Sequence, residues 1–500
     1  MGEFRINVSS IRQRFLEAFR IRSEHAAAID EGMRESIARR LVEEYGSAQG
    51  AADAVWALAR ENEWHKEGAL AERFLLHRPT VTPARNLAAL DLTVAWHASP
   101  IGHLLHDGFE WRWKPIDDQG PPLVRQTTPG QLPPFIASLL PEGWLEKVLH
   151  EKDERAMLRS GKRYMSNITI VEHEAELAKL PSDVLLTRLE TYTAGGAFTG
   201  RYTGPRRGDI EESFEHVLAH VYERADTPRL SGVQIKAPMY LDADGTLSAS
   251  AGRPFTHILK PAGTSGYEPL PVVEWLTMAL GKAAGFVVPA TALVAMPDEM
   301  PPALIVERFD IRSTIEDERR IALEDMCSVF GLSTEAKYRS TMERVARAVR
   351  PLSTAPEEDV ILVLERALFA WLVADDDMHL KNMALLKIAE PGEASFRTVR
   401  IAPLYDAVTT RVFPRLERDR MAIKLNGKDD NLTRNDFRTF AATAGAKAGD
   451  ADSAIDDVLS RLHAAVDRIA LPEAIDYSEP AKNVAGQLLE LCRNRLASMS

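Results

Sequence analysis

One stretch of this sequence passes within a few residues from an apolar helical pattern to a cluster of charged side chains. Apolar residues recur every three or four positions from Ile361 to Leu372, which predicts a buried helix over residues 360–374. Three carboxylates follow at once, Asp375 to Asp377, and a histidine, a lysine and an asparagine come within the next five residues. Because polar groups are costly to bury without partners, we expect a loop here that carries the chemistry of the protein.

The spacing of the polar residues in this loop favours phosphoryl transfer. Asp377 and Asn382 are five positions apart. In protein kinases this separation joins the aspartate that accepts a hydroxyl proton and the asparagine that holds magnesium. Asp406 follows a strand predicted over residues 398–402, where a kinase places its second magnesium ligand. We interpret the two aspartates before Asp377 as helix-end carboxylates. No second histidine lies at ligand spacing, which argues against a zinc site.

Composition and charge narrow the class of protein. The chain has 500 residues, too many for one hydrophobic core, so several packed units are expected. A net charge of -12 argues against a generally basic nucleic-acid binder and favours proteins or small molecules as partners. The 2 cysteines, Cys327 and Cys492, provide no disulfide framework and fit a reducing compartment. Residues 1–10 lack a signal-peptide pattern, and the apolar segment 283–296 is too short to span a bilayer. We therefore expect a cytoplasmic protein without membrane contact.

The first 84 residues predict a helical extension that differs from the rest of the chain. Helical spacing recurs up to about residue 78, and Pro79 and Pro83 then favour an extended linker. From Leu90 to Trp96 the period changes to two, which predicts strands. Basic and acidic residues are nearly balanced in the extension, so it lacks the charge of a DNA-binding module. We interpret it as a packing or dimerisation appendage; a helix-turn-helix or a partner-mimicking role stays open.

The middle of the chain predicts a nucleotide-binding lobe. Lys260 ends a predicted strand, Glu274 lies near the start of a predicted helix over 271–284, and two strands are predicted at 290–296 and 303–308. A lysine on a strand, a glutamate on the next helix and a strand pair is the order of that lobe in a kinase. The glycine-rich segment 195–200 is interpreted as a loop or hinge, because it lacks the Gly-Lys-Ser/Thr of a phosphate-binding loop.

Seven short motifs occur in the order in which one family has them. They are Leu-Leu-Pro-Glu-Gly (139–143), Leu-Ser-Gly-Val-Gln-Ile-Lys (230–236), Thr-His-Ile-Leu-Lys (256–260), Val-Glu-Arg-Phe-Asp (306–310), Glu-Asp-Met-Cys (324–327), Asp-Met-His-Leu-Lys-Asn (377–382) and Leu-Tyr-Asp (404–406). On these motifs the chain, from about Leu90 to its end, resembles the HipA toxin kinases, the serine/threonine kinase component of bacterial toxin–antitoxin systems. The resemblance implies an α+β, bilobal protein-kinase-like fold with a helical N-terminal extension. It also implies domains at 1–84 (extension), 85–185 (strand-rich subdomain), 186–310 (nucleotide-binding lobe) and 311–500 (helical catalytic lobe).

The resemblance also implies roles for single residues. Asp377 would be the catalytic base, Lys260 would contact the ATP phosphates, and Asn382 and Asp406 would hold Mg²⁺. Ser231 matches the serine that members of the family autophosphorylate, which switches the kinase off; a turn residue is the alternative for it. The other residues implied to contact the nucleotide are Val233, Gln234 and Lys236 over the phosphates, Glu307, Arg308 and Phe309 at the hinge, and His379, Lys381 and Tyr405 beside the loop.

The implied function is ATP- and Mg²⁺-dependent phosphorylation of a serine or threonine of a protein. An aminoacyl-tRNA synthetase or another translation component would be the target, growth arrest the outcome, and a DNA-binding antitoxin a partner; no direct binding of nucleic acid is expected. Met378 departs from the family, which commonly has a small residue there. Two alternatives stay open: a kinase-like phosphotransferase for a small molecule, and a non-catalytic regulatory or interaction protein.

Overall fold

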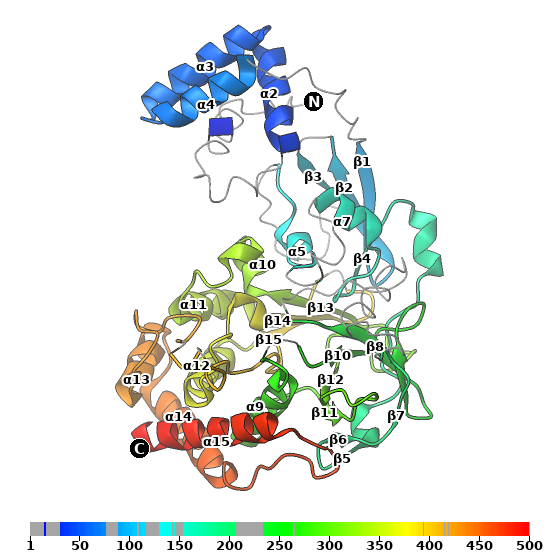
Figure 1. Ribbon diagram of the computed structural model, residues 1–500, viewed down its shortest axis with the longest axis vertical. Helices are drawn as coiled ribbons and strands as arrows, with labels where there is room; N and C mark the ends of the chain where they lie inside the picture. Colours follow the sequence, from blue (N-terminus) through cyan, green and yellow to red (C-terminus); the bar gives the residue numbers. More distant parts are fainter. Residues whose placement is uncertain are drawn as a thin grey trace. The chain divides into compact units, whose positions relative to one another are not determined.

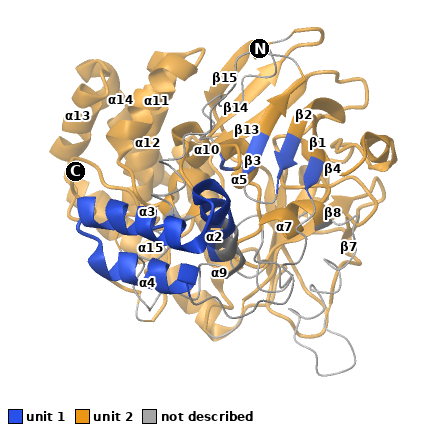
Figure 2. Ribbon diagram, turned by 90° about the horizontal axis from the view of Figure 1, so that it is seen from above, with its two compact units in different colours: residues 1–91, 104–112, 129–131 blue, residues 92–103, 113–128, 132–500 orange. Residues whose placement is uncertain are grey.

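The fold is described here from a computed structural model (Figure 1). The chain divides into two compact units, one of residues 1–91, 104–112 and 129–131 and one of residues 92–103, 113–128 and 132–500 (Figure 2). The structure describes residues 15–16, 31–76, 89–107, 110–116, 130–142, 145, 154–206, 234–263, 266–393, 395–414, 416–418 and 420–499.

Helices dominate the first unit, in agreement with the predicted helical extension. They are α2 (Glu31–Tyr45), α3 (Ala48–Glu61) and α4 (His65–Leu76). The Ser47 side chain accepts the Gly50 N–H and so caps the start of α3. Gly68 allows α3 and α4 to pack closely, because a Cβ on this residue would lie 2.7 Å from the Ala59 side chain. Apolar residues from the three helices, among them Leu41, Val55 and Leu75, form a core of their own.

A small antiparallel sheet follows, as the period-two pattern predicts. Its strands are ordered β3-β2-β1-β4, with β1 at Leu90–Trp96, β2 at Ser99–His106, β3 at Trp111–Pro115 and β4 at Ile168–Val171. β1 pairs with β4 in the register Thr93 to Val171. Three short helical segments lie nearby in the sequence: α5 (Pro134–Ala137), α7 (Glu154–Ser160) and η2 (Glu174–Lys179).

The second sheet contains eight strands in the order β5-β6-β11-β12-β10-β8-β9-β7. Its centre is antiparallel: β10 pairs with β12 on one side and with β8 on the other. Strands β8 and β9 form an antiparallel hairpin with a turn at residues 242–245. The bounds are β5 (Thr193–Ala194), β6 (Ala197–Phe198), β7 (Arg201–Tyr202), β8 (Ala237–Leu241), β9 (Thr246–Ala249), β10 (His257–Lys260), β11 (Thr291–Val294) and β12 (Ala303–Glu307), with η3 (Leu189–Tyr192) before them and α9 (Leu270–Ala284) between β10 and β11.

The rest of the second unit is mostly helical and contains the largest core. A three-stranded sheet, β13-β14-β15, lies beside the helices in Figure 1. Residues of α9 share this core with the C-terminal helices, so it extends from the eight-stranded sheet to α15. The bounds are β13 (Arg320–Asp325), α10 (Met326–Phe330), η4 (Thr334–Ala336), α11 (Met342–Leu352), α12 (Pro356–Val373), η5 (Leu380–Asn382), β14 (Ala384–Ala389), β15 (Thr398–Ile401), α13 (Arg434–Thr443), α14 (Ala448–Ala465) and α15 (Glu479–Met499).

Helix α12 is the buried helix that the apolar spacing predicts. Pro356 occupies its first turn, where a missing N–H costs nothing. Asp359 is fully buried there and accepts hydrogen bonds from the Arg400 side chain and the Ile401 N–H of β15, at 3.0 and 3.1 Å. The helix ends at Ala374, whose φ of 55° is left-handed and whose N–H bonds the Trp371 carbonyl. The turn at Ala374 directs the chain straight into Asp375.

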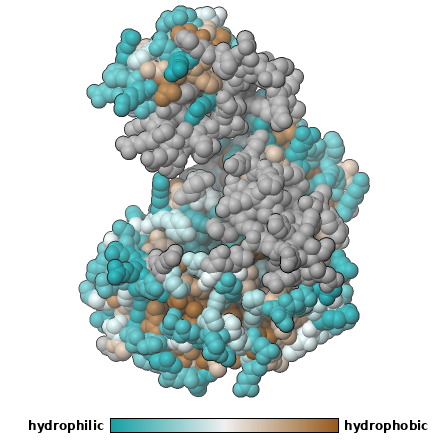
Figure 3. All heavy atoms as spheres, in the orientation of Figure 1, coloured by the Kyte–Doolittle hydropathy of each residue, from teal (hydrophilic) through white to brown (hydrophobic). Residues whose placement is uncertain are grey.

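None of the helices in the described ranges combines the length and apolar character needed to cross a bilayer. On the face shown in Figure 3, apolar side chains of the described residues are interspersed with hydrophilic ones.

Candidate active site

A cavity of about 560 Å³ in the second unit brings the predicted site residues together. Its lining includes residues 234–236 just before β8, residues of β10 and β12, and residues of the loop after α12. Ser231 and Val233 lie outside the described residues. All the other residues predicted for the site line the cavity: Gln234, Lys236, Lys260, Glu307, Arg308, Phe309, Asp377, His379, Lys381, Asn382, Tyr405 and Asp406.

Two lysines and two acids meet at one end of this cavity, which we call the lysine end: Lys236, Lys260, Glu274 and Asp406. Lys260 Nζ donates to Glu274 of α9 and to Asp406, and Lys236 Nζ lies 3.6 Å from Asp406 Oδ2. The Lys260 and Glu274 side chains are only 5% and 2% exposed. Lys260 of β10 and Glu274 of α9, which the sequence analysis related only by their order in the chain, therefore form a buried ion pair.

The charges at the lysine end shift the pKa values of its members in opposite directions. Burial alone would raise the pKa of Asp406, but Lys236 and Lys260 hold it well below its ordinary range. Burial alone would lower the pKa of Lys260, yet the carboxylates of Asp406 and Glu274 raise it. Both groups are therefore ionised at neutral pH. Asp406 also has a left-handed φ of 56°, which aspartate adopts more readily than most residues other than glycine.

The loop after α12 is shaped by its own polar side chains. Asp375 is buried and accepts the Asp377 N–H at 3.2 Å, and Asp376 accepts the Thr410 N–H at 2.9 Å. Asn382 Nδ2 donates to the Asp377 carbonyl at 2.8 Å, which fixes the two ends of the loop relative to each other. The helix-end aspartates thus support the loop, as the sequence interpretation had them.

Asp377 faces the cavity and has the properties of a general base. Its side chain is 39% exposed, and burial together with repulsion from Asp406 raises its pKa to about 6. A base is most effective when its pKa lies near the working pH. The Tyr338 hydroxyl donates to Asp377 Oδ1 at 2.9 Å, and His379 Nε2 lies 3.8 Å from the same oxygen. Burial lowers the pKa of His379 to about 3, so this histidine is neutral.

The other end of the cavity holds a second charge cluster, which we call the loop end: Glu142, Lys337 and Lys381. Lys381 Nζ donates to Glu142 Oε1 at 3.1 Å and to the Ser138 carbonyl at 3.0 Å. Lys337 Nζ lies 3.6 Å from the other oxygen of Glu142. Burial would raise the pKa of Glu142, but the two lysines lower it. Lys381 lines the cavity as predicted, but its ammonium group is held by residues 138–142.

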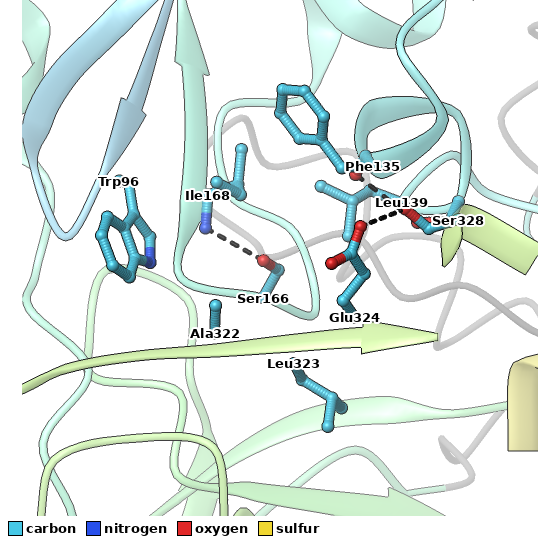
Figure 4. Close-up of a pocket in the computed structure, with 10 residues that line it drawn as sticks. Trp96, Phe135, Leu139, Ser166, Ile168, Ala322, Leu323, Glu324 and Ser328 are labelled. Atoms are coloured by element: carbon cyan, nitrogen blue, oxygen red, sulfur yellow. Dashed lines mark hydrogen bonds between the residues drawn. The ribbon is translucent and has the colours of Figure 1, made fainter. Parts of the chain in front are cut away.

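Residues 135–139 also pack against β13 and α10, close to the loop end. A pocket of about 20 Å³, room for about one water molecule, lies at this contact and is lined by Phe135, Leu139 and Glu324 (Figure 4). Ser328 Oγ donates to Glu324 at 2.9 Å, and Lys387 of β14 forms an ion pair with the same carboxylate. The segment that carries Glu142 is therefore anchored on β13 and α10.

Neighbouring charged residues hold the side chains of two predicted hinge residues, Glu307 and Arg308. Glu307 pairs with Arg188 at 2.9 Å, and Arg308 bonds Asp183 and Asp310 at 3.0 and 2.9 Å. The N–H groups of Glu307 and Arg308 bond the carbonyls of Ala290 and Thr256. A base bound at this edge would therefore use carbonyl groups or the N–H of Phe309. The Phe309 ring lies 5.6 Å from the Tyr405 ring.

The donor atoms fit magnesium better than a transition metal. Among the residues that the structure describes, no group of three or more His, Cys, Asp or Glu side chains is arranged to hold a metal ion. Because its Nδ2 bonds the Asp377 carbonyl, Asn382 would offer its Oδ1 to a metal ion, and Asp406 would offer a carboxylate. Mg²⁺ usually takes one or two such protein oxygens and completes its shell with phosphates and water.

Sequence reasoning missed three residues of this site: Glu142, Lys337 and Tyr338. Glu142 lies in one of the seven motifs, so a signal for it existed, but nothing in the sequence paired it with Lys381. Lys337 and Tyr338 lie in a turn after η4 that matches none of these motifs. Only the folded chain brings them to the loop.

Comparison with known proteins identifies the part of the chain that contains the cavity. Residues 229–466 match the family model "HipA-like C-terminal domain". Two Sinorhizobium fredii proteins are similar: "Putative kinase Y4mE", 34% identical over 43% of this chain and 50% of that protein, and "Putative kinase Y4dM", 27% identical over 56% of this chain and 62% of that protein. The matches thus span about half the length of these relatives, or somewhat more.

A solved structure shares the fold over most of the chain. It is a chain from the Shewanella oneidensis MR-1 toxin–antitoxin complex of HipA, HipB and operator DNA. The TM-score is 0.59 at 19% identity, and the match covers 82% of this chain and 97% of that one. The predicted HipA-like α+β fold is confirmed. The family resemblance is confirmed as well, since residues 229–466 match the HipA-like C-terminal domain family.

Proposed function

We propose that this chain is a kinase that transfers the γ-phosphoryl group of ATP to a serine or threonine of a protein, with Mg²⁺. One observation carries the proposal: Asp377, Asn382, Asp406 and the Lys260–Glu274 ion pair line one cavity. The names of the Sinorhizobium proteins support a kinase. Phosphoryl transfer depends mostly on positioning and on stabilising charge, and both are provided at this cavity.

Each residue has a defined task in the proposed reaction. Asp377 accepts the proton of the attacking hydroxyl, and the fixed loop holds its carboxylate in place. Lys260, positioned by Glu274, donates to phosphate oxygens. Asn382 Oδ1 and Asp406 are the protein ligands of Mg²⁺, which when bound neutralises charge on the phosphates.

The partners of the reaction are proposals as well. The Shewanella fold relative belongs to a complex with HipB and operator DNA. This supports an antitoxin partner that itself binds DNA, and a cytoplasmic location. A translation component such as an aminoacyl-tRNA synthetase is the proposed substrate, growth arrest the outcome, and phosphorylation of Ser231 the means of inactivation.

Labelled ATP and a cell extract test the proposed function. We expect labelled protein with the wild-type chain and Mg²⁺, and none after chelation with EDTA. Asp377→Asn should lower the transfer rate by about 10²–10⁴, while calorimetry shows ATP binding within a few fold of wild type. Label found only in small molecules would identify a small-molecule phosphotransferase instead. Equal transfer by Asp377→Asn would rule out the assigned base.

A further inference from the structure

Tyr338 is a hydroxyl-bearing side chain that already touches the proposed base. It lies between η4 and α11, lines the same cavity as Lys260 and Asp406, and is 47% exposed. Its hydroxyl donates to Asp377 Oδ1 at 2.9 Å. A general base must lie within hydrogen-bond reach of the proton that it removes. Tyr338 meets this requirement without any movement of the chain.

Neighbouring groups hold Tyr338 in this position. Its ring makes an edge-to-face contact with His379, with ring centroids 5.2 Å apart. Two contacts hold the preceding residue, because the Lys337 carbonyl accepts the Leu380 N–H of the loop at 3.0 Å and Lys337 Nζ lies 3.6 Å from Glu142. The fold therefore presents the phenol to Asp377, although the residue is partly exposed to solvent.

The reach of this side chain also bears on the kind of acceptor that the cavity admits. A serine hydroxyl lies one bond beyond Cβ, whereas a tyrosine hydroxyl lies at the far side of an aromatic ring. An acceptor chain that presents serine must therefore come closer to Asp377 than one that presents tyrosine. The phenol of Tyr338 spans the distance from its own backbone to Asp377. The cavity beside Asp377 therefore has room for a tyrosine side chain.

We propose that Tyr338 is itself a phosphoacceptor of this site, modified within the same chain. The inference rests on the proposed function, which supplies ATP and Mg²⁺. The Tyr338 oxygen attacks the γ-phosphorus and its proton passes to Asp377. The bond between the γ-phosphorus and the β,γ-bridging oxygen breaks, and ADP leaves with that electron pair. A phosphate adds about -1.5 to -2 charges, which Asp377 repels, so the modified ring turns toward solvent and leaves Asp377 open to other hydroxyls.

Mass spectrometry of the purified full-length chain after incubation with Mg²⁺ and ATP tests this proposal. We expect one phosphate on the peptide that contains Tyr338 and none there in Tyr338→Phe or Asp377→Asn. The fraction modified with time should not change on dilution, because the reaction is intramolecular. Tyr192→Phe is the matched control: it also removes a tyrosine hydroxyl, one that donates to the Ala243 carbonyl at 2.6 Å and does not line the cavity. It should leave phosphorylation of Tyr338 unchanged.

Other results overturn the proposal in distinguishable ways. A chain that phosphorylates other residues or proteins while Tyr338 stays unmodified refutes this inference and leaves the proposed function intact. Modification that slows on dilution refutes the intramolecular step. Faster labelling of other proteins by Tyr338→Phe, with no phosphate on Tyr338 in the wild type, would mean that the phenol only blocks the base. A wild-type chain that binds no ATP in calorimetry refutes the proposed function and this inference together.

Discussion

The two ends of the cavity use the same residue types but are assembled in different ways. At the lysine end, Lys260 and Glu274 are 14 residues apart and face each other across one short stretch of chain. At the loop end, Lys381 and Glu142 are 239 residues apart. Three members of the lysine end therefore come from residues 236–274 and only Asp406 comes from farther along the chain, whereas the loop end exists only when residues 138–142 are docked. A mostly local cluster and a long-range one thus line the same cavity as Asp377.

We expect the largest loss of stability and of ATP binding when Lys260, which bonds both Glu274 and Asp406, is removed. Lys260→Met leaves Glu274 and Asp406 without their closest cation, and breaking a buried pair in this way costs about 3–5 kcal/mol. We expect that loss in the free energy of unfolding measured with urea, together with loss of ATP binding. Lys260→Met/Glu274→Gln should recover part of the stability but none of the binding. A cost below about 1 kcal/mol would mean that water reaches the Lys260–Glu274 pair and that the pair contributes little to stability.

Glu142→Gln tests whether the loop end depends on long-range docking. It removes the charge that holds Lys337 and Lys381, both nearly buried, and should cost about 2–3 kcal/mol. We also expect turnover to fall while ATP affinity stays within a few fold, because the lysine end is intact. Glu357→Gln is the control: it breaks an exposed pair with Arg350 and should cost under about 1 kcal/mol. If Glu142→Gln lost as much ATP affinity as Lys260→Met, the idea that the two ends act separately would be wrong.

His97, a partly buried histidine outside both ends of the cavity, should make the stability of the chain depend on pH. The Ile321 N–H donates to His97 Nε2 at 2.9 Å, and burial together with Arg312 lowers the pKa of His97 from 6.5 to about 4. The unfolded chain therefore binds a proton that the folded chain excludes, and stability falls as the pH drops from 6.5 toward 4.

Between pH 7 and pH 5 this contribution should amount to about 1–2 kcal/mol. Urea unfolding at both pH values measures it, and the difference should shrink in His97→Gln, which keeps an acceptor but does not titrate. His97 has a φ of 49°, so the substitution can shift the stability itself; only the dependence on pH is diagnostic. An unchanged pH dependence in His97→Gln would assign the acid sensitivity to other groups.

The smallest expected effect is at Ala374, where α12 ends. A left-handed φ favours glycine at this position of a helix end. Ala374→Gly should therefore stabilise the chain by about 0.5 kcal/mol net, after the greater entropy of glycine in the unfolded chain is subtracted. Turnover should fall slightly, because the loop at Asp375 is held less firmly. A clear loss of stability would show that contacts of the Ala374 methyl group matter more than its backbone strain.

The parts of the fold and site that could be predicted are those that depend on residues close together in the sequence. Apolar spacing predicted α12, found at Pro356–Val373, and the strand before Asp406, found at Thr398–Ile401. The Glu142–Lys381 pair could not be predicted, because no repeating pattern in the sequence marks which charged residues pair and because the two partners lie far apart in the chain. Strands of two residues, such as β5 to β7, are too short for an alternating pattern. The roles of the single residues and the four domain boundaries stay predictions.

The left-handed backbone at Asp406 restricts how the site can change during evolution. Glycine, asparagine and aspartate enter this region at the lowest cost, so the substitutions that preserve the path of the chain are Asp406→Asn and Asp406→Gly. Both remove the charge that pairs with Lys236 and Lys260. Glutamate would keep the charge but not the favoured backbone. One nucleotide change, from an aspartate codon to an asparagine or glycine codon, therefore keeps the path of the chain and removes at once the carboxylate that pairs with the two lysines.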